Sequence, residues 1–282
     1  MSKPKSVVST WVSAVRPNTL PASVSPVIVG SALGESIPRI IQSHPQVIVS
    51  HGLGAAYADG GRNVGEAFIF WLFALCIQIG TNLHNDYADF VKGADTSERL
   101  GQARATQKGW LTATEVATGA TVALGLAGAL GVRLIARGGW SMVFVVLTSE
   151  FNAVAYTGGP YPLGYIHPKL GDFSLGYLGL GDLFVLLYFG YVAVCGTYFL
   201  QHLTLTDHVL WVATPVGFLA TAIIVVNNLR DRKTDVKANK LTMAVRFGAR
   251  FARIEYDLLL PLALFFPSLP PSPFRPSSAH TV

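Results

Sequence analysis

Long apolar stretches separated by short polar loops dominate this sequence. A helix that crosses a bilayer needs about 20 mostly apolar residues. Stretches of roughly this kind cover residues 18–34, 64–84, 112–136, 139–157, 178–200, 208–227 and 255–268. The first contains Pro21 and Pro26, and the last is short and ends near Pro267. The pattern predicts an all-α, polytopic bundle of about seven transmembrane helices.

Composition supports the lipid bilayer as the solvent of this chain. Hydrophobic residues make up 51% and charged residues 13% of the sequence, whereas soluble domains carry about 25% charge. Ahead of the first span, Val8, Trp11, Val12 and Val15 follow the i, i+3, i+4, i+7 spacing of an amphipathic helix. We therefore expect residues 1–16 to form an arm with an interfacial helix, and a short transit peptide is the alternative.

One transmembrane domain is expected over residues 17–268, followed by a Pro/Ser-rich tail over 269–282. Two segments inside the domain are predicted insertions. Residues 35–63 form a long, Gly-rich connector, and residues 166–177 separate two copies of a Leu-Gly-Tyr sequence.

The basic residues are distributed unequally between the two sides of the predicted bundle. Of 21 Lys and Arg residues, 16 lie in the N-terminal arm and in the loops after the second, fourth and sixth spans. Basic residues are retained on the cytoplasmic side, so these loops are predicted to be cytoplasmic or stromal, in a bacterial inner membrane or a plastid membrane. The net charge of +5 then reflects topology and an anionic ligand. No nucleic-acid-binding motif is found in these loops, so that class of partner is excluded.

Two Asn/Asp-rich sequences lie on this basic side. The first, at the end of the second span, is Asn85-Asp86-Tyr87-Ala88-Asp89 and continues to Asp95. If the helix continues through it, Asn85, Asp86 and Asp89 share one face.

The second sequence follows the sixth span and reads Asn227-Asn228-Leu229-Arg230-Asp231, continuing to Asp235. Asn227, Asp231 and Asp235 are spaced i, i+4, i+8, which again places them on one helical face. The two sequences resemble each other in spacing, as expected for a site between two halves of a membrane fold.

The chemistry of these residues suits a magnesium-bound diphosphate. Mg²⁺ takes oxygen ligands and usually binds one or two carboxylates together with substrate phosphates. Cations that could hold a diphosphate lie in the same loops, namely Lys92, Arg104, Lys108, Arg230, Lys240 and Arg246. Solvated helix ends are the alternative for a single acidic cluster. A cation transporter is a further alternative, but it would need acids in mid-span, and only Glu150 is placed there.

The sequence resembles the UbiA superfamily of intramembrane aromatic prenyltransferases. The resemblance covers roughly residues 11–255 and is carried by the following segments: Arg16-Pro17-Asn18-Thr19-Leu20-Pro21-Ala22-Ser23, Gln78-Ile79-Gly80-Thr81-Asn82, the first Asn/Asp-rich sequence, Gln107-Lys108-Gly109, Tyr156-Thr157-Gly158-Gly159-Pro160-Tyr161-Pro162, and the second Asn/Asp-rich sequence through Asp235, Lys240 and Thr242. The Tyr-Thr-Gly-Gly-Pro-Tyr-Pro run is typical of the branch that uses 1,4-dihydroxy-2-naphthoate.

The resemblance implies a set of site residues. Those expected to arrange the metal and the prenyl diphosphate are Asn85, Asp89, Asp95, Asn228, Asp231 and Asp235. The carboxylates expected to bind Mg²⁺ are Asp86, Asp89, Asp95, Asp231 and Asp235, and the cations expected at the diphosphate are Lys92, Arg104, Lys108, Arg230 and Lys240.

The implied reaction transfers a polyprenyl or phytyl group from its diphosphate to 1,4-dihydroxy-2-naphthoate, with loss of carbon dioxide, in menaquinone or phylloquinone biosynthesis. Another aromatic acceptor is an alternative. Neither the length of the prenyl chain nor the oligomeric state can be read from the sequence.

The sequence departs from the family pattern in its C-terminal part. The Pro-rich end allows no helix to follow, so the last helices of the bundle are expected to be missing. A truncated, inactive family member is therefore an alternative interpretation. Glu150 and Asn152 lie inside the fourth span, where a carboxylate is costly. Either they face the bundle interior, or the segment is displaced by the predicted insertion, which is the interpretation favoured here.

Overall fold

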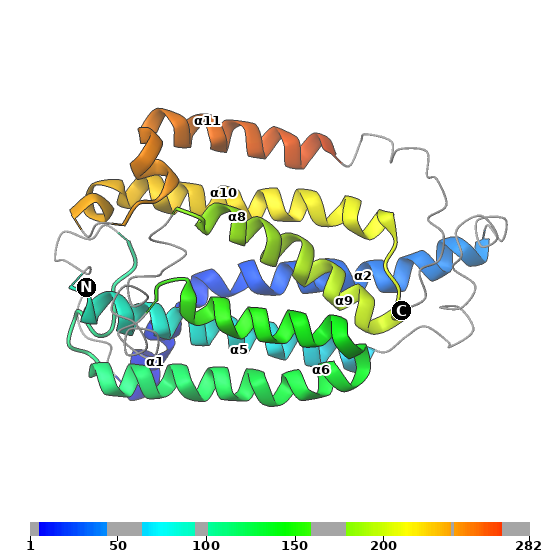
Figure 1. The fold of residues 1–282 in the computed structure, drawn as a ribbon, viewed down its shortest axis with the longest axis horizontal. Coiled ribbons are helices and arrows are strands. Elements are labelled where there is room, and N and C mark those ends of the chain that lie inside the picture. The colour runs from blue at the N-terminus through cyan, green and yellow to red at the C-terminus, as the bar shows by residue number, and fades with distance from the viewer. Residues whose placement is uncertain (1–5, 44–63, 94–100, 159–178, 238–239, 267–282) are drawn as a thin grey trace.

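A computed structural model describes residues 6–43, 64–93, 101–158, 179–237 and 240–266, and the side chains of 35–43 are not among those described. In these ranges most residues are helical, and long helices lie side by side along one axis (Figure 1). The all-α class is therefore confirmed. The predicted insertion at 166–177 and the tail at 269–282 lie outside the described residues.

The bundle begins with α1 (Val7–Val15), a 3-10 turn (Pro17–Thr19) and α2 (Leu20–Ser43). It continues with α5 (Val64–Val91) and α6 (Ala113–Ala155). The next helical run is formed by α8 (Gly181–Val185), the π-helix η2 (Leu186–Val192) and α9 (Ala193–His202), and it is followed by α10 (Asp207–Lys237) and α11 (Met243–Phe265). Helix α2 extends through the first residues of the predicted connector, which is helical as far as Ser43.

Four of the described helices are long and apolar enough to cross a membrane, namely Gly65–Val91, Ala113–Ala155, Gly181–His202 and Asp207–Lys237. The predicted spans at 64–84, 178–200 and 208–227 are thereby supported. The first predicted span is helical as part of α2, and most of the seventh lies in α11. The predicted number of spans is therefore confirmed only in part.

The third and fourth predicted spans are two antiparallel arms of α6. The chain reverses at Gly139, whose φ of 61° and ψ of −146° interrupt the helix, and Figure 1 shows the resulting hairpin. A Cβ built on Gly131 of the first arm would lie 2.6 Å from Val146 of the second. Thr112 begins the first arm with a capping box, in which Glu115 accepts from the Thr112 N–H at 2.7 Å.

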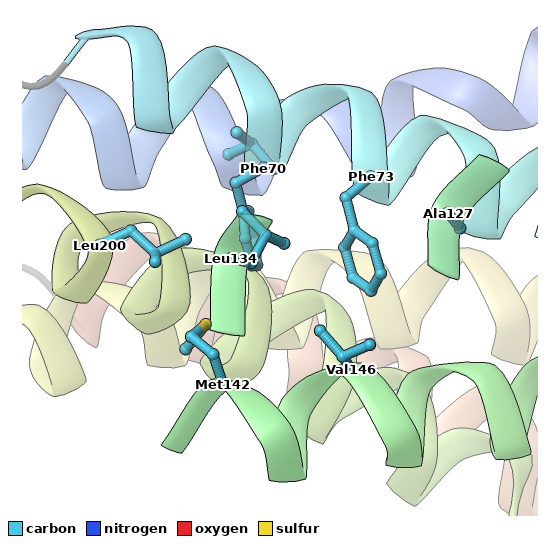
Figure 2. Close-up of a cluster of buried hydrophobic side chains, with 8 residues drawn as sticks. Phe70, Phe73, Ala127, Leu134, Met142, Val146 and Leu200 are labelled. Atoms are coloured by element: carbon cyan, nitrogen blue, oxygen red, sulfur yellow. The ribbon is translucent and has the colours of Figure 1, made fainter. Parts of the chain in front are cut away.

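An apolar cluster fixes the arrangement of α2, α5, α6 and α9 (Figure 2). It contains the buried side chains of Val27, Phe70, Phe73, Ala127, Leu134, Met142, Val146 and Leu200. Small residues allow a second close contact, because a Cβ on Gly190 of η2 would lie 2.7 Å from the Gly217 Cα of α10. Contacts between small residues are the usual means by which membrane helices approach closely.

Helix α1 exists as predicted, but its side chains are distributed differently from the expectation. Val8 and Val12 are exposed, whereas Thr10 and Ala14 are buried. Trp11 packs against α6, because a Cβ on Gly119 would lie 2.7 Å from its ring. The exposed apolar face of α1 therefore contains Val8 and Val12 but not Trp11.

Glu150 lies between the two arms of α6 and α5. A Cβ on Gly128 would lie 3.8 Å from Glu150 Oε1, and the carboxylate interacts electrostatically with Cys76 of α5. The helix is regular at this point and Glu150 is half-buried, which supports the alternative in which Glu150 faces the bundle interior. The predicted insertion lies outside the described residues, so the displacement of the segment stays a prediction.

Candidate active site

The two Asn/Asp-rich sequences lie at the C-terminal ends of α5 and α10, and these ends lie at the same end of the bundle (Figure 1). Both helices continue well past the apolar stretch, to Val91 and Lys237. Both Asn/Asp-rich sequences are therefore helical, as expected, and the polar side chains of each lie on one face of their helix. We call the set on α5, which includes Asn85, Asp86 and Asp89, the first row, and the set on α10 the second row.

Asp86 holds the loop that follows α5. Its carboxylate accepts the Ala105 N–H at 2.8 Å and the Thr106 N–H at 3.4 Å, and it also accepts from the Thr106 hydroxyl. The side chain is almost fully buried. Because both of its oxygens accept from protein donors, Asp86 holds this loop against α5. The metal-binding role expected for it stays a prediction.

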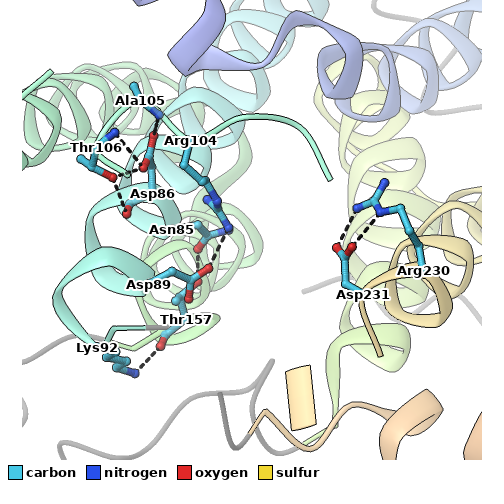
Figure 3. A network of polar contacts seen from close by, with 10 residues as sticks. All are labelled: Asn85, Asp86, Asp89, Lys92, Arg104, Ala105, Thr106, Thr157, Arg230 and Asp231. Carbon is cyan, nitrogen blue, oxygen red and sulfur yellow. Dashed lines mark hydrogen bonds and ion pairs between the residues drawn. The ribbon is translucent and has the colours of Figure 1, made fainter. Parts of the chain in front are cut away.

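Asp89 pairs with Arg104 of the same loop. Arg104 Nη2 lies 2.7 Å from Asp89 Oδ2, and both side chains are about 95% buried. Removing one partner of a buried ion pair leaves an uncompensated charge and is strongly destabilising. Asp86 and Arg104 together fix the backbone of residues 104–106 against α5 (Figure 3).

Three further side chains at the C-terminal end of α5, including Lys92 just after the helix, contact the residues that follow α6. Asn85 accepts a hydrogen bond from the Thr157 hydroxyl, and Lys92 Nζ donates to the Thr157 carbonyl at 2.6 Å. His84 Nε2 lies 3.2 Å from the Gly158 carbonyl oxygen. The first row therefore holds the start of the Tyr-Thr-Gly-Gly segment, and Lys92 contacts this backbone as well as being a candidate for the diphosphate.

The second row is formed by Asn228, Asp231 and Asp235 of α10. Asn228 and Asp235 are buried, whereas Asn227 is only half-buried. Arg230 forms a two-point contact with the neighbouring Asp231, at 2.8 and 2.7 Å. Asn228 rather than Asn227 is thus the buried amide of the row.

Two contacts connect the rows. A Cβ on Gly101 would lie 2.8 Å from Arg230 Nη2 and 3.5 Å from Asp231 Oδ2. Gly101 precedes Arg104 by three residues, a reach of about 10 Å at most, so this loop runs from the second row to Asp89. The Tyr156 hydroxyl interacts electrostatically with Asp89, Asp182 and Asp235, which places it between the rows.

The remaining predicted site residues are dispersed. Lys108 is exposed in the loop after α5, and Lys240 is half-buried before α11. Arg246 is exposed and its Nε donates to the Leu241 carbonyl at 3.0 Å. Asp95 lies outside the described residues.

Two residues of the site were missed by reasoning from sequence, namely Asp182 and Tyr156. Asp182 stands beside the second row and accepts a hydrogen bond from Asn228. Its only sequence signal is that it is an acid at the start of an apolar span, where ionisable residues are functional candidates. Tyr156 was noticed only as part of a motif.

The donor set fits a cation that arrives with phosphate oxygens. In the described residues no three His, Cys, Asp or Glu side chains are grouped closely enough to hold a metal by themselves. Mg²⁺ needs only one or two carboxylates when a substrate supplies further oxygens. Asp89 and Asp231, each beside an arginine, satisfy that requirement, and the arginines suit bidentate phosphate contact.

The fold and the site define an α-helical membrane protein that carries two Asn/Asp-rich rows with adjacent arginines at one end of its bundle. The chain belongs to the UbiA prenyltransferase family, whose model matches residues 47–279.

Similar proteins include the 1,4-dihydroxy-2-naphthoate octaprenyltransferase of Haemophilus influenzae, which is 34% identical over 264 residues, or 90% of this chain and 74% of the relative. The enzyme of the same name from Escherichia coli is 33% identical over 89% of this chain and 72% of the relative. That from Mycobacterium tuberculosis is 32% identical over 90% and 75%, respectively.

Proposed function

We propose that this protein transfers a prenyl group from its diphosphate to 1,4-dihydroxy-2-naphthoate. The observation that carries the proposal is the pair of facing rows around Asp89 and Asp231, in a chain that is 34% identical to a naphthoate octaprenyltransferase. Two acidic rows with adjacent arginines suit a substrate that carries both a diphosphate and its metal ions.

In the proposed reaction the bond between the allylic carbon and the diphosphate oxygen breaks, and the electron pair leaves with the diphosphate. The ring carbon that bears the carboxylate forms the new bond to the allylic cation. The bond to the carboxylate then breaks, carbon dioxide leaves, and its electron pair restores the aromatic ring. The products are a prenylated naphthoquinol, carbon dioxide and diphosphate.

Asp89, Asp95, Asp231 and Asp235 are the proposed metal-binding carboxylates. Bound Mg²⁺ would stabilise the charge on the departing diphosphate. Arg104 and Arg230 would bind the diphosphate oxygens, because each guanidinium already lies at one of the two rows. Lys108 and Lys240 are proposed as further cations for the same group.

The naphthoate is proposed to bind beside the Tyr-Thr-Gly-Gly segment. Support comes from the three α5 side chains that hold Thr157 and Gly158, since they couple this segment to the first row. The apolar interior between the helices would accommodate the prenyl tail. We further propose that the two rows face the cytoplasm or the stroma, which the distribution of basic residues supports.

The test is prenylation by the purified full chain in lipid nanodiscs. It would receive octaprenyl diphosphate, MgCl₂ and naphthoate labelled with ¹⁴C at its carboxyl group, with 4-hydroxybenzoate as the competing acceptor. We expect release of labelled carbon dioxide and an equal amount of prenylated naphthoquinol. Asp231→Asn should reduce both together.

Prenylation of 4-hydroxybenzoate in preference to the naphthoate would refute the proposed acceptor. A folded protein that prenylates neither acceptor would refute the proposed reaction and favour the alternative of an inactive family member.

A further inference from the structure

Asp182 is a buried carboxylate beside the second row that belongs to neither Asn/Asp-rich sequence. It is 5% exposed and lies in the first turn of α8. Asn228 Nδ2 of α10 donates to its Oδ1 at 3.1 Å, across a separation of 46 residues. The contact is possible because α8 begins close to its neighbours: a Cβ on Gly181 would lie 3.0 Å from the Tyr156 hydroxyl and 3.5 Å from Ile224 of α10.

The contact with Asp182 fixes the orientation of the Asn228 amide. An ionised carboxylate only accepts hydrogen bonds, whereas an amide group carries a donor NH₂ and an acceptor oxygen. Asn228 must therefore direct its NH₂ towards Asp182, which turns Oδ1 away from that carboxylate. Amide oxygens are suitable ligands for hard cations, and Asn228 is spaced i, i+3 and i, i+7 from Asp231 and Asp235 on α10.

The surroundings of Asp182 indicate a role in the site. Tyr156 and Glu255 both interact electrostatically with Asp182, and Tyr156 also interacts with Asp89 and Asp235. A buried carboxylate among other acids is costly in an apolar environment and is usually functional in membrane helices.

Asp182 also has a counterpart in the first row. There, Asn85 is held from outside its helix by the Thr157 hydroxyl just after α6, although through the opposite atom, because Asn85 Oδ1 accepts this hydrogen bond. In the second row, Asn228 is held from outside its helix by Asp182 at the start of α8. The amides of both rows are thus fixed by the two ends of the same connection between α6 and α8.

We propose that Asp182 is a positioning residue of the diphosphate site, whose carboxylate orients the Asn228 amide so that Oδ1 faces the cation held by the second row. The proposal rests on the proposed function in so far as the cation arrives with a prenyl diphosphate. It assigns Asp182 no contact with substrate, and its effect is exerted through Asn228.

The test uses the full chain in nanodiscs and measures binding without turnover. Mn²⁺ would be titrated by electron paramagnetic resonance in the presence of a non-reactive phosphonate analogue of the prenyl diphosphate. We expect Asp182→Ala to weaken Mn²⁺ binding about 10-fold or more, the effect of losing a hydrogen bond to a charged group. A second variant exchanges the two side chains, combining Asp182→Asn with Asn228→Asp. The amide at position 182 then donates to the carboxylate at position 228, so the hydrogen bond is restored. Mn²⁺ binding should recover to within a few-fold of the wild type.

Thr214→Ala is the matched control. Thr214 forms a part-buried contact of 2.8 Å with Tyr191, between α10 and the η2 segment that directly follows α8, and it lies about four turns away from Asn228. It should leave Mn²⁺ binding unchanged while lowering the melting temperature comparably.

An Asp182→Ala variant with a lower melting temperature but unchanged Mn²⁺ binding would overturn the positioning role, and so would an exchanged variant that folds but does not recover binding. A wild-type protein that binds Mn²⁺ with the analogue yet prenylates no naphthoate would instead refute the proposed acceptor and leave the role of Asp182 standing.

Discussion

Substitutions of Asp86 can distinguish two roles for this residue, namely binding a metal ion and holding the loop that follows α5. Replacing it with Ala removes the carboxylate that accepts from the Ala105 N–H and the Thr106 hydroxyl and, at 3.4 Å, from the Thr106 N–H. Hydrogen bonds to charged groups contribute about 1.5–3 kcal/mol each. Two such bonds at the lower value give about 3 kcal/mol, which corresponds to an increase on the order of 100-fold in the opening equilibrium of the loop.

Hydrogen exchange of the nanodisc-embedded protein measures this opening directly. We expect the Ala105 and Thr106 amides to lose protection by roughly the factor derived above, while the amides of the α6 hairpin keep theirs. Asp86→Asn should show a smaller loss, because the amide oxygen still accepts one hydrogen bond. We predict that neither substitution removes a metal ligand, so the Mg²⁺ concentration needed for half-maximal activity should change far less than in Asp89→Asn.

The opposite result would refute this reasoning. If Asp86→Asn raises the required Mg²⁺ concentration as much as Asp89→Asn does, and loop exchange is unchanged, Asp86 is a metal ligand.

Three further substitutions test the packing and the coupling of the site. Gly139→Ala should destabilise the α6 hairpin by about 1–3 kcal/mol, because a side chain is strained at the φ of 61° and ψ of −146° of this residue. The control is Gly125→Ala, whose Cβ would meet open space. Equal unfolding midpoints of the two variants would contradict the prediction. Gly190→Ala should force η2 away from α10, since its Cβ would lie 2.7 Å from the Gly217 Cα, and a melting temperature unchanged from the wild type would count against this close contact. Thr157→Val should raise the KM for prenyl diphosphate by a factor of about 5–10, which corresponds to the loss of one hydrogen bond. Thr157→Ser should retain the wild-type KM, because its hydroxyl still reaches Asn85. Equal KM values for the two variants would refute this role of the Thr157 hydroxyl.

Hydropathy and local spacing were enough to predict the class of fold and the position of both rows. The apolar stretches at 64–84 and 208–227 are each about as long as the hydrocarbon core is thick, so these two helices follow from composition alone. The helical rows follow from a period that needs no partner, because i, i+3 and i, i+4 neighbours share a face in any helix. Even the interior position of Glu150 was one of two alternatives, although the less favoured one.

Which atoms the side chains of these rows contact depends on the tertiary structure. The Asp86 carboxylate meets backbone amides 19 and 20 residues away, and Lys92 meets a carbonyl 65 residues away. Sequence spacing contains no information about such partners, so residue type and the family resemblance assigned Asp86 to the metal and Lys92 to the diphosphate, and the backbone contacts of both were not foreseen. Asp182 was overlooked for the same reason, since its significance comes from Asn228 on another helix.

The sequence by itself therefore determined a helical membrane protein with two Asn/Asp rows and a family resemblance, because apolar length and helical period are properties of single segments. Only the tertiary structure decided which of the acids and amides is held by the protein and which faces the site. Hydrogen-bond partners are set by how helices pack, and that packing depends on contacts such as those between Gly190 and Gly217, or between the two arms of α6, which lie outside the reach of any local pattern.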